Sequence, residues 1–434
     1  MTSGGCPFGG GAPAPGVSRR GLIGRAAAAA GAVAAGAAAA AVGVDVAHAD
    51  GADGADGATT APAPAGEVVY PFEGAHQQGI LTPKQRQAAY VAFDVTAGNA
   101  GQLKGLLQIL TDQIRFLMAG GTPPDAGLLA TNPDNGILGP VVPADGLTVT
   151  VSVGSSLFDG RFGLSKAKPA HLRQMDEFPN DALERSICDG DLLLQICADN
   201  ADTVVHALRQ ITRNTRGDMQ VRWRCDGFDS PPRPSGTSRN LLGYKDGTGN
   251  PPTTDDALMD QLIWTHAGGK EPTWVEGGSY HVVRLIRMFV EFWDRVSVRE
   301  QDNIFGREKI TGAPLTGTNE FDVPDYTADS TEDVILGNAH IRLANPRLGP
   351  TTDRQRILRR SFNYDLGTDA SGDLNMGHLF TAFNQDLDRQ FVAIQKRLVD
   401  EPLVDYVSPV GGGYFFALPG VQGSSDWLGR GMFA

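Results

Sequence analysis

The sequence predicts an α+β fold made of two ferredoxin-like domains, each an antiparallel sheet with helices packed on it. Strand-like and helix-like segments follow the order β-α-β twice in the first half of the chain, and the second half has a similar order. A stretch rich in Pro, Ser and Gly at 226–236 lies between the halves. We therefore expect an N-terminal domain at 67–235 and a C-terminal domain at 236–434.

Hydrophobic periodicity predicts the elements of the first domain. Residues 101–118 place Leu103, Leu106, Leu107 and Leu110 at helical spacing. Residues 147–153 alternate apolar residues with Thr and Ser, as a half-buried strand does. The full predicted set is strands at 88–95, 147–153, 191–197 and 219–225, and helices at 101–118 and 202–212.

The second domain is expected to have a similar order of elements. A helix is predicted over 288–296, because Phe289, Phe292 and Trp293 would share one side of it. The long polar connection at 306–332 is a candidate functional loop. The remaining predicted elements are strands at 280–285, 360–364 and 414–417, and a strand followed by an amphipathic helix within 379–398.

Residues 1–49 have the pattern of a twin-arginine export signal and are not expected to belong to the fold. Ser18-Arg19-Arg20-Gly21-Leu22-Ile23 precedes an Ala-rich run from Ala26 to Val44 and the small-x-small site Ala47-His48-Ala49. An uncleaved anchor helix is the alternative. The Gly- and Pro-rich residues 50–66 predict a flexible linker. We expect a mature protein in the periplasm or in the extracellular or cell-wall space, without stable membrane insertion.

Charge and cysteine content argue against several classes of protein. The net charge of −13 disfavours non-specific binding to nucleic acid, which needs a basic surface, and attraction to anionic lipid. After the signal, Cys188, Cys197 and Cys225 remain, and an odd number does not imply a disulfide framework. Cys197 lies in an apolar run and is expected in the core.

One candidate functional stretch is the glycine-rich loop at 240–251, which carries Asp246 between glycines. Glycine allows the backbone to approach a flat or charged ligand closely. A solvated turn is the alternative, since Asp, Gly, Asn and Pro favour turns. A calcium loop does not fit the spacing, because its sixth position would be Pro251 and its twelfth Ala257.

A second stretch at 337–347, Gly-Asn-Ala-His-Ile-Arg-Leu-Ala-Asn-Pro-Arg, is followed by Arg-Ile-Leu-Arg-Arg at 356–360. Together with Gly-x-x-Asp-Gly at 243–247, these residues resemble the dye-decolourising haem peroxidases, and more closely their exported deferrochelatase/peroxidase branch. The resemblance covers most of the chain after about residue 70. It includes further motifs at 277–280, 284–288, 304–307 and 411–419.

The resemblance implies haem b, held between the sheet and helices of the C-terminal half. The binding is expected to be non-covalent, because the sequence has no Cys-x-x-Cys-His. The resemblance also implies that hydrogen peroxide oxidises bulky aromatic donors through a ferryl state. The resemblance implies that His340, which lies in the family-like context Asn-Ala-His-Ile-Arg…Asn-Pro-Arg, is the iron ligand. Asp246 is the expected distal acid/base and Arg359 the distal cation, with Arg356 as the competing choice. Asn240 is expected to orient the acid or a distal water.

Further haem contacts are expected from the residues around these positions. Asp386, preferred over Asp388, is predicted to accept a hydrogen bond from the second nitrogen of His340. Arg347 is a candidate partner for a haem propionate. The cofactor-binding residues implied by the resemblance are Gly247, Thr248, Gly249, His340, Asn345, Pro346, Arg347, Arg359 and Asp386.

The resemblance leaves alternatives within the same site. One is a deferrochelatase, which takes haem as its substrate and releases the iron while leaving the porphyrin intact; components of an iron-uptake system would then be partners. A non-catalytic haem carrier is another, although it has no use for an acid paired with a cation. A phosphate binder is remote, since the loop lacks Gly-x-x-x-x-Gly-Lys. A homo-oligomer is expected, as is common in the family.

Overall fold

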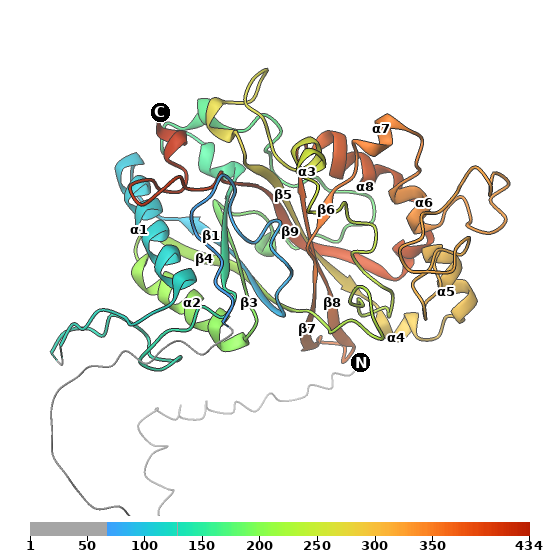
Figure 1. Ribbon diagram of the computed structural model, residues 1–434, viewed down its shortest axis with the longest axis horizontal. Coiled ribbons are helices and arrows are strands. Elements are labelled where there is room, and N and C mark those ends of the chain that lie inside the picture. The colour runs from blue at the N-terminus through green and yellow to red at the C-terminus, as the bar shows by residue number, and fades with distance from the viewer. Residues whose placement is uncertain (1–66, 128) are drawn as a thin grey trace, which may run out of the picture. The chain divides into compact units, whose positions relative to one another are not determined.

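The computed structural model describes residues 67–434 except residue 128 (Figure 1). The predicted signal at 1–49 and the predicted linker at 50–66 lie outside the described residues. Within the described residues, no helix has both the length and the apolar character needed to cross a bilayer.

The first half forms a four-stranded antiparallel sheet with two helices on one face. Its strands lie in the order β2-β3-β1-β4, which is the ferredoxin-like order. The elements are β1 (Gln87–Val95), α1 (Ala100–Ala119), β2 (Thr148–Gly154), β3 (Leu192–Ala198), α2 (Ala201–Asn214) and β4 (Met219–Phe228). Helix α1 begins where the side chain of Asn99 accepts a hydrogen bond from the backbone of Gln102, and it ends at Gly120, whose φ is 68°.

The second half repeats this arrangement with strand order β9-β5-β8-β7. Its strands are β5 (Ser279–Met288), β6 (Leu358–Arg359), β7 (Phe362–Thr368), β8 (Leu374–Asn384) and β9 (Val407–Ala417). Its helices are α3 (Asp256–Leu262), α4 (Val290–Trp293), α5 (Val298–Phe305), α6 (His340–Ala344), α7 (Pro350–Asp353) and α8 (Ala393–Arg397). A π-helical turn at Asp388–Val392 leads into α8. Short 3₁₀ turns occur at Ser155–Phe158, Ser165–Ala167, Arg185–Ile187, Thr273–Val275, Pro402–Asp405 and Arg430–Phe433.

The two sheets join at both edges. Strand β9 pairs with β2, and β4 pairs with β7 through Phe228 and Asn363, so all strands except β6 form a closed ring. The ring interior is packed: Tyr90 and Ala92 of β1 face inward, while Val91 and Phe93 face α1 and α2. Figure 1 shows these two helices together on the first-half sheet, away from α5 and α6 of the second half. This confirms the predicted α+β fold with its ferredoxin-like halves.

Several predicted elements are displaced. The helix predicted at 288–296 is wrong in extent: β5 continues to Met288, the backbone of Phe289 bonds to Tyr406, and only Val290–Trp293 is helical. The aromatic spacing was misleading, since Trp293 is buried whereas Phe292 is 52% exposed. Strand β8 begins at Leu374, ahead of the predicted strand, and its polar early residues concealed it. The prediction for Cys197 is confirmed, because it is fully buried and unbridged.

Candidate active site

A cavity of about 290 Å³ lies in the C-terminal half, between the sheet and the helices α5, α6 and α8. Its walls are contributed by the loop around Asp246, by alternating residues of β5 and β8, and by α6 and α8. Ile286, Met288 and Phe380 supply apolar wall, and a group of arginines supplies charge. A mostly apolar cavity with a few convergent polar groups is typical of a cofactor or ligand site.

On one side of the cavity, Asp246 lies between two partners. Arg359 Nη1 donates a hydrogen bond to Oδ1 at 3.0 Å, and His378 Nε2 lies 2.9 Å from Oδ2. Burial acts to raise the pKa of the Asp246 carboxyl, but His378 and Arg359 outweigh it and hold that pKa well below its ordinary value. The carboxylate therefore stays ionised, while its side chain is only 15% exposed.

The position of Arg359 is set by the same loop that carries Asp246. The side-chain amide of Asn250 donates to the Arg359 carbonyl at 2.7 Å, and its oxygen accepts from the Arg359 backbone N–H at 3.1 Å. This pair of bonds acts like a rung of a β-ladder and joins the loop to β6. Gly247, at φ 94°, makes the turn between Asp246 and Asn250.

His340 is the first residue of α6 and lines the same cavity. Its Nδ1 lies 2.6 Å from Oε2 of Glu401, whose side chain is 7% exposed. An ionised carboxylate can only accept, so this contact places the imidazole proton on Nδ1 and leaves Nε2 as the nitrogen that can bind a metal. The edge of the Phe305 ring packs nearby, with ring centroids 5.9 Å apart.

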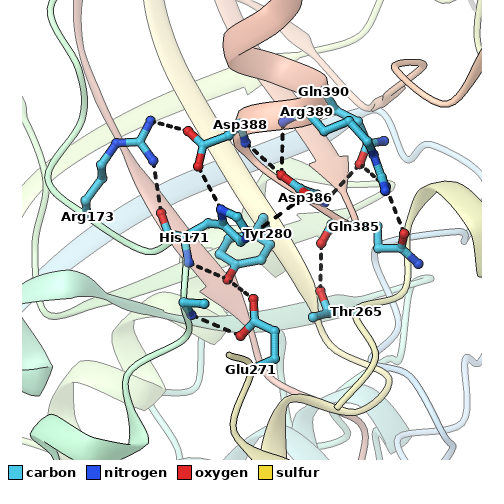
Figure 2. Close-up of polar contacts among 11 residues, drawn as sticks. His171, Arg173, Thr265, Glu271, Tyr280, Gln385, Asp386, Asp388, Arg389 and Gln390 are labelled. Atoms are coloured by element: carbon cyan, nitrogen blue, oxygen red, sulfur yellow. Dashed lines mark hydrogen bonds and ion pairs between the residues drawn. The ribbon is translucent and has the colours of Figure 1, made fainter. Parts of the chain in front are cut away.

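The prediction that Asp386 accepts a hydrogen bond from His340 is wrong, and the alternative, Asp388, does not contact His340 either. Figure 2 shows both aspartates beside His171: Asp388 Oδ2 lies 2.7 Å from His171 Nδ1, and Asp388 Oδ1 lies 2.8 Å from Arg173 Nη2. Asp386 Oδ1 accepts from two backbone N–H groups at the start of the π-helical turn. The two carboxylates thus fasten the 155–191 insertion to the turn before α8 and do not line the cavity.

The other predicted haem contacts divide into two groups. Asn240 lines the cavity, but its Oδ1 accepts from the backbone of Leu242 and Tyr244, so its observed role is to shape the loop. Gly247 and Pro346 are not among the residues that line the cavity. The predicted residues that do line it are Thr248, Gly249, His340, Asn345, Arg347 and Arg359.

Arginines gather on the cavity wall. The pKa of Arg307 is lowered by burial and by the nearby charges of Arg359 and Arg347, and the pKa of Arg356 by burial and Arg347. Among the described residues, neither Arg347 nor Arg356 lies within ion-pair distance of a carboxylate. Such a cluster suits a ligand that brings negative charge of its own. A porphyrin with two carboxylates and an iron needing an imidazole ligand fits these residues.

Comparisons with known proteins agree with this fit. The model of the Dyp-type peroxidase N-terminal domain matches residues 77–229, and that of the C-terminal domain matches residues 237–422. Together the two models span most of the chain.

The chain belongs to the Dyp-type peroxidase family.

Members of the family are similar to this chain along most of their length. Proteins named deferrochelatase are 50% identical over 367 residues in Escherichia coli strain UTI89 and in Shigella flexneri; the match covers 83% of this chain and 86–87% of theirs. A Dyp-type peroxidase structure from Cellulomonas bogoriensis has a TM-score of 0.75 at 35% identity, covering 85% of this chain and 98% of that one. Ferric DtpA from Streptomyces lividans has a TM-score of 0.75 at 34% identity, with the same coverage. Membership of this family makes the chain an enzyme and implies a haem group.

Two residues of this Dyp-type site were missed in the sequence. His378 lies in β8 without a flanking pattern that indicates a site, and only the pairing of β8 with its neighbours brings it to Asp246. Glu401 lies 61 positions after His340, just before a 3₁₀ turn. A Glu followed by Pro carries no signal that separates an iron-ligand partner from a turn residue.

Proposed function

We propose that this protein is an exported haem b peroxidase of the dye-decolourising type, which reduces hydrogen peroxide and oxidises bulky aromatic donors. The observation that carries the proposal is the pairing of Asp246 with Arg359 at 3.0 Å in the wall of a cavity that His340 also lines. A pure haem carrier needs a ligand and an apolar pocket, but not a carboxylate held ionised beside a fixed cation.

His340 and Glu401 would hold the haem. When bound, the haem supplies the iron that coordinates peroxide and takes up its oxidising equivalents. His340 would coordinate that iron through Nε2, and Glu401 makes the imidazole a stronger donor by accepting from Nδ1. Arg347 and Arg356, which line the cavity, are the proposed partners of the haem carboxylates.

Asp246 and Arg359 would handle the proton and the charge. Asp246, which is ionised, would accept a proton from one oxygen of hydrogen peroxide and return it to the other oxygen, which would leave as water. Arg359 stabilises the negative charge that develops as the O–O bond breaks. The proton transferred is the same proton returned, so Asp246 ends each cycle ionised.

The test of this role is the reaction of the reconstituted protein with hydrogen peroxide in a stopped-flow spectrometer. We expect the ferric spectrum of the wild type to change at a rate proportional to peroxide concentration. Asp246→Asn should retain haem and slow that change by about 10²–10⁴-fold, the usual worth of a positioned acid/base. An unchanged rate in Asp246→Asn would remove the proposed role of this residue.

Deferrochelatase activity is the second candidate, favoured by the 50% identity to proteins with that name. In this case haem is the substrate: the iron leaves and protons replace it on the pyrrole nitrogens. Incubation of the pure protein with haem, followed by fluorescence of free porphyrin, separates the two. A porphyrin signal that the His340→Ala variant lacks would support this activity, and its absence in the wild type would exclude it under those conditions.

Export by the twin-arginine route, a location in the periplasm or cell-wall space and assembly into homo-oligomers remain part of the proposal. They rest on the sequence pattern at Ser18–Ile23 and on the family resemblance. Replacing Arg19 and Arg20 by Lys should stop export of the full chain, measured as retention in the cytoplasmic fraction. Sedimentation velocity of the mature protein tests the subunit number.

A further inference from the structure

We propose that His378 is a positioning residue for the distal acid: by its contact with Oδ2 it holds the Asp246 carboxylate so that Oδ1 faces Arg359. This rests on the proposed function of Asp246. Nothing in the sequence or in the family comparisons assigns His378 a role. Each oxygen of the Asp246 carboxylate has its own partner: Arg359 of β6 contacts Oδ1, and His378 of β8 contacts Oδ2.

The backbone around His378 is fixed by close packing. His378 lies between Gly377 and Leu379, and Leu379 belongs to the packed interior of the strand ring. At Gly377, an added Cβ would lie 2.0 Å from the carbonyl oxygen of Ile286 and 2.6 Å from the Tyr364 hydroxyl. Strand β8 therefore runs tightly between β5 and β7, with Ile286 and Asn363 opposite His378. Because the strand is tightly packed on both sides, the position of the His378 imidazole is fixed.

The imidazole itself has one partner. Nε2 lies 2.9 Å from Asp246 Oδ2, whereas Nδ1 is buried and has no hydrogen-bond partner among the described residues. Because the ionised carboxylate can only accept, the proton at this contact belongs to Nε2. The side chain of His378 is only 10% exposed, and its contact with Asp246 supplies the polar partner that a buried imidazole needs.

Arg359 and His378 together fix the orientation of the Asp246 carboxylate. Arg359 contacts only Oδ1 of Asp246, and one contact leaves the carboxylate free to rotate about its Cβ–Cγ bond. A second donor on Oδ2 fixes the plane of the carboxylate, because the two contacts define it. The charged or titratable groups that face Asp246 are Arg359 and His378, and at longer range Lys84, which pairs with Asp229 at 2.7 Å.

The test compares His378→Leu, which removes the donor, with His378→Gln, which keeps a side-chain N–H. The first measurement is made on haem-free protein labelled with ¹³C at the aspartate carboxyls, with Asp246→Asn identifying the Asp246 signal. Loss of the donor should raise the pKa of Asp246 by about one unit or more. His378→Gln should lie nearer the wild type.

The second measurement is the pH dependence of the peroxide reaction in the haem-loaded variants. If Asp246 is the base, the acidic limb of the profile in His378→Leu should move to higher pH by the same amount, so the rate on that limb falls about ten-fold. Haem content and thermal unfolding serve as folding controls. The inference is overturned if His378→Leu leaves either the Asp246 titration or the acidic limb unmoved, or if His378→Gln behaves as His378→Leu does.

The two measurements also separate this inference from the proposed function. A wild-type protein that does not react with peroxide would defeat the proposed function, while the carboxyl titration would still report whether His378 governs Asp246. A shifted titration with an unshifted rate profile would retain the contact and overturn the positioning role in the reaction.

Discussion

His340 Nδ1 and Glu401 Oε2 lie 2.6 Å apart, and this contact joins α6 to the segment that follows α8. It gives the imidazole a fixed orientation and a fixed tautomer. In the proposed site this sets how strongly Nε2 donates to iron.

The contact makes Glu401→Gln informative, since glutamine keeps the shape and loses the charge. We expect the variant to bind haem about 10–100-fold more weakly than the wild type, measured by transfer of haem to an apo-globin acceptor. The matched control is Asp386→Asn, which removes a carboxylate that does not touch His340. A larger loss of haem in Asp386→Asn than in Glu401→Gln would reverse the assignment.

Arg359 and Arg356 are the two candidates for the distal cation, and matched variants compare them directly. Arg359→Leu removes the hydrogen bond to Asp246, so we expect it to retain haem and to slow the peroxide reaction by at least about 10²-fold. Arg356→Leu leaves that bond in place and should mainly weaken haem retention. Stopped-flow rates and haem occupancy measured side by side decide this; the opposite pattern would make Arg356 the distal cation.

The depressed pKa of Asp246 has a consequence for activity in acid. A carboxyl whose pKa is lowered in the folded protein stays ionised as the pH falls through its ordinary value of 3.8. The peroxide reaction should therefore keep its rate from neutral pH down through pH 3.8, where a carboxyl of ordinary pKa would be half protonated. A rate constant measured across this range, with enzyme returned to neutral pH as the stability control, checks it. A fall centred near pH 6 would show that another group limits the reaction.

Asn250 should matter although it touches neither Asp246 nor the proposed iron ligand. Asn250→Ala removes both bonds to the Arg359 backbone, which should cost about 1–3 kcal/mol of unfolding free energy. Without these two bonds, the Arg359 side chain would form its hydrogen bond to Asp246 for a smaller fraction of the time. The rate of the peroxide reaction should therefore fall, while haem occupancy stays near that of the wild type. Denaturant unfolding and stopped flow measure the two effects, and a stable variant at full rate would contradict this role of Asn250.

Much of the fold could be predicted because the relevant signals are local. The leucines of α1 and the alternation in β2 report burial directly, and both elements lie within one or two residues of the predicted bounds. The helix expected at 288–296 failed because Phe289 bonds to the backbone of Tyr406, which lies far along the chain. Tertiary pairing overrode the local pattern there.

The candidate site also combines residues that local motifs predict with residues that only the folded structure brings together. Motifs that match a family predict Asp246, His340 and Arg359 as site residues, and the structure brings them around one cavity. His378 and Glu401 could not be found in this way, since each becomes a neighbour of a site residue only through strand pairing or a long loop. Asp386 was chosen by its type and place in the sequence, yet its carboxylate caps a helical turn beside His171.

The central claim is that His340 holds an iron porphyrin in this cavity. Its most direct test is the absorption spectrum of wild type and His340→Ala after reconstitution with hemin and gel filtration, with the exposed His266→Ala as control. We predict a Soret band that travels with the wild type and with His266→Ala and is lost from His340→Ala. A colourless wild type, or a His340→Ala variant with the wild-type band, would contradict the account.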